Sequence, residues 1–431
     1  MNIRRTGIML LILLSLSGCA APEQEESTYI AESSDHKNDF GSGEEQDENE
    51  DYELKNIKMK PEEVEELSKS VLEAAEKCQA VYRKAGKNDA SDIALQEETV
   101  HQLIEDAAKG GLSITCGGTD YNMQNYEKVD QALNKAKRGK NAETEFYEIN
   151  TSGIVRYIRL QFKKQKLYVT SVSAILNDNA KAQIQQVEKI QAYDWEYTQK
   201  GWLIWEKALS RNQEMDMHVF YRVLPLDAKC RELGNKCIIP VSYFCNNLFL
   251  TDWDVNSMGN LEFNDLYEFL YQMKYGEKMD EEACDGGIPK IEFEEVVQSF
   301  FDISTEQLET FARYDKERGV YPWESIKCWN RIPQFQPFPE VVNYIENEDG
   351  SLTLLVEAVF TEGGKDCSFK HEVTIKEQGE GWIYLGNMTE KDESYRILQY
   401  RPRRAFYNTN KERTEVCDIY EEKELRNCPD R

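Results

Sequence analysis

Two hydrophobic periodicities follow one another along this chain, and their order restricts the possible folds more than any other feature. Apolar residues recur three, four and seven positions apart from Val64 onward, which predicts a helix with one buried face starting at Pro61. Similar stripes predict two more helices, one stopped by Gly110 and one over residues 123–137. From about residue 144 to 209, apolar and polar residues alternate, as in strands. Helices followed by an antiparallel meander predict an α+β module.

A middle segment follows this meander. A hairpin turning at Lys200-Gly201 is expected just before it. Residues 217–224 and 237–244 are strand-like, and residues 261–273 predict an aromatic-rich helix. The segment either extends the sheet of the first module or bridges the two halves of the chain.

The last part of the chain repeats the order of elements in the first. A helical stripe starts at Phe293, and Ser304 with Gln307 fits a capping box for the next helix. Strands are then expected over residues 351–360, 367–376 and 381–386. The repetition predicts tandem α+β modules of helices packed on antiparallel meanders. This order resembles the cystatin-like and nuclear-transport-factor-like cones of many exported proteins.

The N-terminus has the pattern of an export signal. Arg4 and Arg5 precede a short apolar run, residues 7–17, which is about half of the ~20 residues that a membrane span needs. The run ends in Leu16-Ser17-Gly18-Cys19, which resembles the lipobox of bacterial lipoproteins. This resemblance implies a cleaved signal peptide and a lipidated Cys19 that anchors the protein to the extracytoplasmic face of the cell membrane. The alternative is an ordinary secretory signal with an incidental cysteine.

Charge and pattern divide the rest of the chain. Residues 20–55 hold thirteen Asp or Glu against two Lys, a net charge of −11, and few aliphatic residues, which predicts disorder. The expected organisation is a signal peptide (1–18), an acidic disordered linker (19–55), a first α+β module (56–215), a middle segment (216–287), a second α+β module (288–400) and a C-terminal helical tail (401–431).

The tail supplies a geometric expectation about its two cysteines. A helix over residues 417–427 would separate Cys417 from Cys428 by roughly 16 Å. A disulfide needs Cα atoms within about 7 Å, so these two cysteines should not bond to each other.

Composition excludes some partners. A formal net charge of −27, without a compensating basic stripe, argues against binding to nucleic acid. The chain has no Cys-x-x-Cys, and its four histidines, His36, His101, His218 and His371, are scattered, so a structural zinc site of common spacing is not expected.

Two short segments have residues suited to chemistry. Asp252, Asp254 and Asn256 alternate as at the start of a calcium loop, but Ser257 and Phe263 stand where that loop needs glycine and glutamate, so we interpret the segment as a turn. In the strand expected from Cys367, alternation puts Cys367 and His371 on one face. They would lie roughly 13 Å apart, too far for a hydrogen bond, which favours a histidine in the core.

Some residue types in the chain are also those that hydrolyse or bind carbohydrates. The chain has many carboxylates, but a glycosidase pair cannot be recognised from their spacing alone. Six tryptophans could stack on a sugar or anchor cores: Trp195, Trp202, Trp205, Trp253, Trp323 and Trp329.

The stretches 193–207, 247–271 and 288–304 look like an uncharacterised lipoprotein family of Gram-positive gut anaerobes, known as a domain of unknown function. The resemblance implies a cell-surface location and carries over no catalytic, cofactor or metal residue, so Cys19 is the one site residue assigned. The favoured function is a membrane-anchored, non-catalytic binding or assembly module for an envelope protein or glycan. The alternatives are the substrate-binding lipoprotein of a transporter and a cell-envelope carbohydrate hydrolase.

Overall fold

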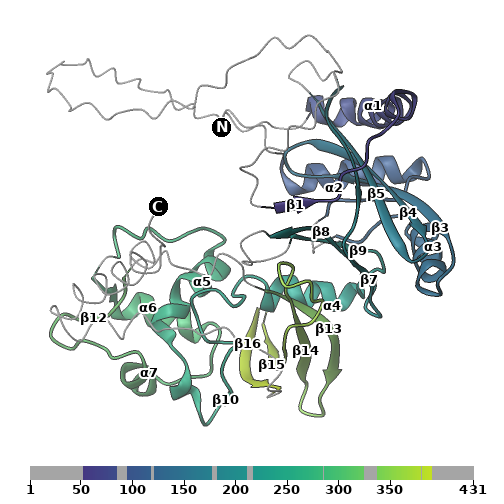
Figure 1. Ribbon diagram of the computed structural model, residues 1–431. Coiled ribbons are helices and arrows are strands. Elements are labelled where there is room, and N and C mark those ends of the chain that lie inside the picture. Colours follow the sequence, from purple (N-terminus) through teal and green to yellow (C-terminus); the bar gives the residue numbers. More distant parts are fainter. Residues whose placement is uncertain are drawn as a thin grey trace, which may run out of the picture. The chain divides into compact units, whose positions relative to one another are not determined.

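The computed structural model describes residues 52–84, 95–117, 121–176, 182–210, 217–284, 286–324, 337–379 and 381–390. All of them belong to one compact unit, Glu50–Arg431, and they form seven α-helices and sixteen strands (Figure 1). None of the described helices is both long and apolar enough to cross a membrane. The expected signal peptide, most of the acidic linker and the C-terminal helical tail lie outside the described residues.

The first half of the unit, up to Val223, contains a five-stranded sheet with three helices and a second sheet of four strands. The helices are α1 (Pro61–Lys84), α2 (Glu97–Lys109) and α3 (Glu127–Lys137). Across the sheet the strands are ordered β2 (Ile114–Thr115), β3 (Ala142–Ile149), β4 (Ile154–Lys163), β5 (Lys166–Leu176) and β6 (Ala182–Gln191). Neighbours are antiparallel except β2 and β3, which are parallel. The expected helices and meander are confirmed, with one parallel strand added at the edge.

Both faces of this sheet are covered, each over a different part. Strand β4 shows the change, because Tyr157 and Ile158 are both buried although neighbouring strand residues point to opposite faces. Tyr157 packs in one core with Val71 of α1. Ile158 packs in another, with Leu133 of α3 and residues of the next sheet. The five-stranded sheet therefore buries α1 and α2 on one face, and α3 together with a second sheet on the other face.

The second sheet is built around β8 (Trp202–Ser210). One edge of β8 pairs with β7 (Trp195–Tyr197) and then with β1 (Tyr52–Leu54), and β9 (Met217–Arg222) pairs with the other edge. The β7–β8 hairpin turns at Lys200-Gly201, as expected. Strand β1 corrects the prediction that the linker is disordered as far as Lys55, because pairing with β8 satisfies the backbone groups of these residues.

The second half of the unit has its own core. Its elements are α4 (Ala228–Leu233), a π-helical turn (Gly234–Ile238), β10 (Trp253–Asp254), a 3₁₀ turn (Met258–Asn260), α5 (Phe263–Tyr275), β11 (Ile288–Pro289), α6 (Lys290–Gln298), α7 (Thr305–Phe311), β12 (Val320–Tyr321), β13 (Phe338–Glu346), β14 (Ser351–Val359), β15 (Lys370–Gln378) and β16 (Gly381–Thr389). Strands β11 and β12 pair together, and the others form an antiparallel sheet ordered β10-β16-β15-β14-β13.

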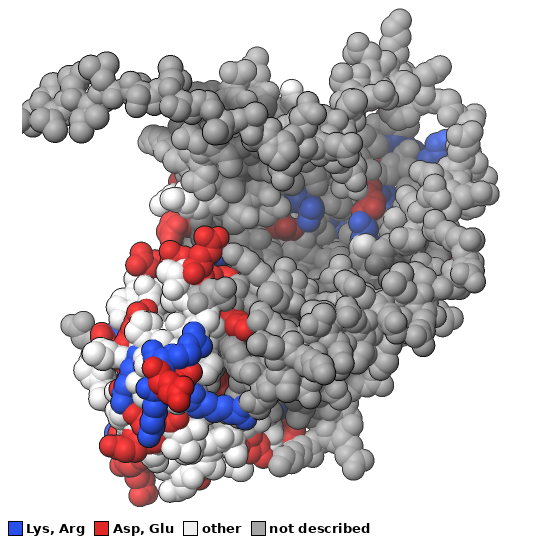
Figure 2. All heavy atoms as spheres, turned by 90° about the vertical axis from the view of Figure 1, so that its left-hand side faces the viewer, with Lys and Arg blue, Asp and Glu red and all other residues white. Residues whose placement is uncertain are grey.

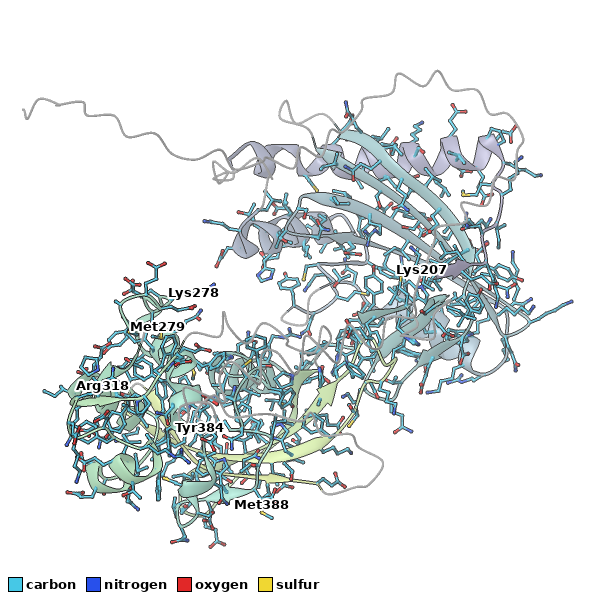
Figure 3. All side chains as sticks on the ribbon, turned by 60° about the vertical axis from the view of Figure 1, so that its left-hand side comes forward. Lys207, Lys278, Met279, Arg318, Tyr384 and Met388 are labelled. Atoms are coloured by element: carbon cyan, nitrogen blue, oxygen red, sulfur yellow. The ribbon has the colours of Figure 1, made fainter. Side chains whose placement is uncertain are left out.

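A bulge in β16 decides which side chains enter this core. Tyr384 is fully buried, and Asn387 is 1% exposed. Both point inward because the register of β16 against β15 shifts between them. Met388 is 67% exposed and lies on the outer side of the sheet (Figure 3).

The predicted α+β class is confirmed, and the capping box of Ser304 and Gln307 is present at α7. The strand expected over residues 237–244 is wrong. Cys237, Ile238 and Val241 are buried, but they belong to the π-helical turn and the turns after it. A positive φ of 50° at Ser242 also interrupts any extended run there. Strand β13 was not expected from the sequence.

Gly201 provides a test of this packing. It has φ +88°, and a Cβ there would lie 2.9 Å from the backbone nitrogen of Leu224 and still closer to its side chain. Gly350, in the β13–β14 turn, has φ +77° with nothing within 4 Å. We expect Gly350→Ala to cost about 1 kcal/mol of unfolding free energy from backbone strain, and Gly201→Ala about 3 kcal/mol because collision adds to strain. Urea unfolding measures both, and equal losses would contradict the close approach of Leu224.

Candidate functional site

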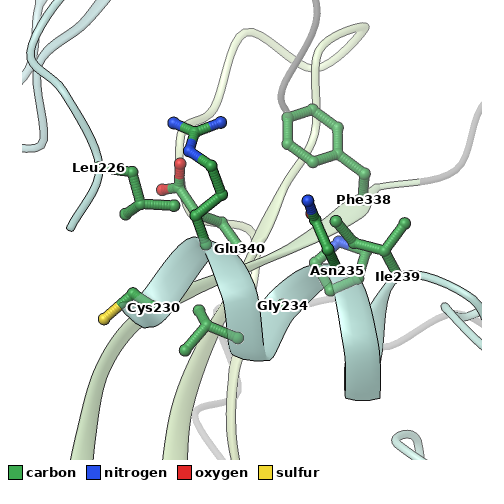
Figure 4. Close-up of a pocket in the computed structure, with 10 residues that line it drawn as sticks. Leu226, Cys230, Gly234, Asn235, Ile239, Phe338 and Glu340 are labelled. Carbon is green, nitrogen blue, oxygen red and sulfur yellow. The ribbon is translucent and has the colours of Figure 1, made fainter. Parts of the chain in front are cut away.

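A shallow pocket lies between α4, the π-helical turn and the start of β13 (Figure 4). The carboxylate of Asp227 caps α4 by accepting hydrogen bonds from the N–H groups of Lys229 and Cys230. Gly234 then packs closely against Val341 of β13. The pocket is lined by Leu226, Cys230, Arg231, Gly234, Asn235, Ile239, Phe338, Pro339, Glu340 and Val341.

Glu340 is the buried carboxylate of this pocket, 7% exposed, and its oxygens are bound by three side chains of the first half. Oε1 accepts a hydrogen bond from Arg222 Nη1. Oε2 accepts one from Trp202 Nε1 at 3.4 Å and pairs with Lys200 Nζ at 3.3 Å. Both oxygens of this carboxylate are therefore occupied by cations and an indole N–H of the first half.

The ion pairs continue from Lys200 into the next strands. Its ammonium lies 2.8 Å from Glu357 Oε2 on β14, and Glu357 Oε1 lies 3.1 Å from Lys370 Nζ on β15. Burial works to raise the pKa of Glu357, but the hydrogen bonds and charges of Lys200 and Lys370 outweigh it and hold this pKa below its usual range. We call the series Arg222, Glu340, Lys200, Glu357 and Lys370 the ion ladder.

His371 lies in the core, as the interpretation of the sequence favoured. It is 2% exposed, with Nδ1 2.7 Å from Asn387 Oδ1 and Nε2 2.9 Å from the Tyr243 hydroxyl. Burial lowers the pKa of His371 to about 4, although the hydrogen bond with Asn387 opposes the shift. The imidazole is therefore neutral and enclosed at physiological pH.

Cys367 does not join His371 in a catalytic pair. The expected strand begins at Lys370 rather than at Cys367, and the thiol donates toward Phe369 O at 3.7 Å. Burial raises the pKa of Cys367 to about 11, helped by the nearby carboxylate of Glu357. The thiolate, which is the reactive form, is thus disfavoured at neutral pH.

The aspartates of the calcium-like segment accept hydrogen bonds from backbone N–H groups and side-chain hydroxyls. Asp252 Oδ1 accepts hydrogen bonds from the N–H and hydroxyl groups of Thr389 on β16, at 2.8 and 2.6 Å. Asp254 Oδ1 accepts from Asn256 N–H at 2.9 Å and from Ser257 Oγ at 2.8 Å, as in an Asx turn. Among the described residues, no three His, Cys, Asp or Glu side chains are grouped so that they could hold a metal ion.

Most of the tryptophans considered for sugar stacking are enclosed. Trp202, Trp205, Trp253 and Trp323 are each 4% exposed or less, so their faces pack against protein. Trp195 is half-buried and donates its indole N–H to Gln165 O at 2.9 Å. Trp329 lies outside the described residues.

The surface carries charges of both signs. Figure 2 shows Lys and Arg side chains mixed with Asp and Glu on one face of the described residues. Lys274 of α5 lies 2.8 Å from Glu295 of α6, and Lys290 of α6 pairs with Glu309 of α7. Such exposed pairs contribute little to stability.

The chain belongs to a family of unknown function, DUF6070, whose pattern matches residues 64–403. The match covers both halves of the unit and all five members of the ion ladder. No curated protein and no solved structure matches the chain. The resemblance to a domain of unknown function that the sequence suggested is therefore confirmed. Sequence reasoning missed Glu340 and Arg222, because nothing in their local patterns marks an ion pair 118 residues apart.

The buried imidazole of His371 predicts a pH dependence of stability. Its pKa in the folded protein, about 4, lies below the ordinary value of 6.5, so the unfolded chain binds more protons between these values. Stability should therefore fall as the pH drops through this window, by about 2.5 kcal/mol between pH 7 and pH 4.5.

The contribution of His371 is isolated by comparison with His371→Gln, since other groups titrate equally in both proteins. Tyr243 stays protonated throughout, because burial raises its pKa well above 10. Urea unfolding of both proteins at pH 7 and pH 4.5 measures the difference. Equal pH dependence of the two proteins would show that His371 is not enclosed.

Proposed function

We propose that this protein is a lipid-anchored extracytoplasmic lipoprotein that acts as a non-catalytic binding or assembly module for an envelope protein or glycan. The arginines, the apolar run and the lipobox-like Leu16-Ser17-Gly18-Cys19 support the anchor. The acidic stretch that follows Cys19 would be repelled by anionic envelope polymers and would hold the folded unit away from them.

One observation supports the non-catalytic part of this proposal. The candidates for catalysis considered among the described residues are bound by other groups of the protein: Glu340 by two cations and an indole, and His371 by Tyr243 and Asn387. Cys367 is held as a thiol by its raised pKa. A general acid, general base or nucleophile needs an atom that is free to reach a substrate, and the reactive atoms of Glu340 and His371 are already engaged.

The two alternatives draw less support. The substrate-binding proteins of transporters are built from parallel βαβ lobes, whereas the two large sheets here are antiparallel apart from the short β2–β3 pair. A carbohydrate hydrolase needs two carboxylates, one of which keeps its proton at neutral pH. Glu340, the carboxylate of the pocket, is bound by Arg222 and Lys200, and the hydrogen bonds and charges of Lys200 and Lys370 lower the pKa of Glu357.

The anchor is tested by Cys19→Ser in the full chain, expressed in a bacterial host that processes lipoproteins. Without the thiol no lipid can be attached, so we expect the protein to move from the membrane fraction to the soluble or secreted fraction. Labelling with a fatty-acid analogue should mark the wild type only. Cys78→Ser is the control, since it also removes one cysteine and should stay in the membrane fraction. Unchanged fractionation of Cys19→Ser would refute the assignment.

The absence of catalysis is tested by incubating the purified full chain with isolated bacterial cell walls. We expect the protein to sediment with the walls or with their proteins, without releasing soluble sugars or peptides above background. Glu340→Gln, which keeps the shape of the side chain, serves as the reference. Release by the wild type that is lost in Glu340→Gln, with circular dichroism unchanged, would establish a hydrolase instead.

A further inference from the structure

The two halves of the compact unit have separate cores. Buried apolar side chains of residues 67–223 form two clusters, and those of residues 230–384 form a third. Within the described residues the chain passes from the first half to the second once, over residues 223–227. Each half therefore has the means to remain folded while the other moves.

Among the described residues, the apolar contact that joins the halves is small. Trp202, Ile204 and Val359 form a cluster of three buried residues, with the rings of Phe220 and Phe338 at its border. Each of these two rings lies 5.9 Å from the ring of Trp202, centroid to centroid. A contact of this size opposes separation weakly compared with either core.

The junction also contains the ion ladder and His218 of β9, whose Nδ1 lies 3.2 Å from Glu362 O in the second half. Lys200 and Arg222 come from the first half, and Glu340, Glu357 and Lys370 from the second, so three of its four links cross the junction. Lys200 also donates to the backbone oxygen of Asp366 in the second half. Enclosed ion pairs lose hydration and gain little net stability, but they demand one geometry. They orient the halves without binding them strongly, because separation would return the charges to water.

The crossing segment is held at one point. The side chain of Asn122, from the first half, donates to Leu226 O at 3.3 Å and accepts from Leu226 N–H at 2.9 Å. Asn122 also accepts a hydrogen bond from Arg231 of α4. These bonds fix the start of the second half to the first half, and they involve no residue of the ion ladder.

We propose that the ion ladder is a latch and that the two halves swing apart about the segment 223–227, with Asn122 holding the pivot. Each half keeps its core during this motion. Phe338 and Glu340 belong both to the junction and to the pocket, so opening the latch changes the pocket wall formed by β13. A partner that fills the pocket would therefore favour one of the two arrangements.

The test replaces Lys200, which makes two of the three crossing links. In Lys200→Met, Glu340 keeps Arg222 and Glu357 keeps Lys370, so no carboxylate is left without a cation. Spin labels are introduced through non-cysteine side chains at Lys128 on α3 and Met388 on β16, both exposed, in the full chain. Pulsed electron resonance then measures the distribution of distances between the halves.

We expect one narrow distance in the wild type. In Lys200→Met a second population at a different distance should appear. Its share should be roughly ten times that of any such population in the wild type. Lys200→Arg, which keeps the charge, should restore the narrow distribution. Identical distributions for the wild type and a folded Lys200→Met would overturn the proposal.

Two further variants separate a latch from general loosening. Lys207→Met removes a lysine from β8, the strand that follows the turn at Lys200. The partner of Lys207, Glu188, belongs to the first half, so this variant should leave the distance unchanged. Glu357→Gln, which weakens the crossing link to Lys200 and leaves Lys200 paired with Glu340, should produce a smaller second population and serves if Lys200→Met does not fold. A displaced population in Lys207→Met, or none in Glu357→Gln, would contradict the latch.

Discussion

The carboxylate of Glu340 is the group on which the relation between the two halves depends. It is almost fully buried, and Arg222, Lys200 and Trp202 reach it from the other half of the chain. A buried carboxylate without such partners would cost several kcal/mol, so β13 can occupy its position only when the turn at Lys200 and strand β9 are in place. The pocket beside Glu340 therefore also depends on the turn at Lys200 and on strand β9, because Phe338 to Val341 form one of its walls.

The cores explain why the halves tolerate such a junction. In the first half, the sheet buries odd-numbered side chains of β4 beneath α1 and even-numbered ones beneath α3, and it gains two hydrophobic cores from one meander. In the second half, α5, α6 and α7 share one core with the sheet that contains β16. Each half is thus stabilised by its own apolar burial, and the junction can be polar without endangering either.

Local signals predicted the elements whose formation depends on nearby residues. Pro61 starts α1, Gly110 ends α2, and Ser304 with Gln307 caps α7, since each acts within a few positions of its own backbone. The strand expected at residues 237–244 failed because Cys237, Ile238 and Val241 fit a buried strand and a buried helical turn equally well. For the candidate site, the sequence indicated only which chemistries are not expected. Glu340 itself was not predicted, because its partners are distant in sequence.

The sequence by itself determined the α+β class, the order of helices and strands, and the family to which the chain belongs. These follow from periodicity, caps and turns, which act over a few residues. Only the tertiary structure decided that His371 is neutral, that Glu340 is enclosed and paired with Arg222, and that Trp202 lies at a junction instead of on a sugar-binding surface. Protonation and exposure depend on the groups that surround a side chain, and packing brings those groups from positions that no local pattern connects.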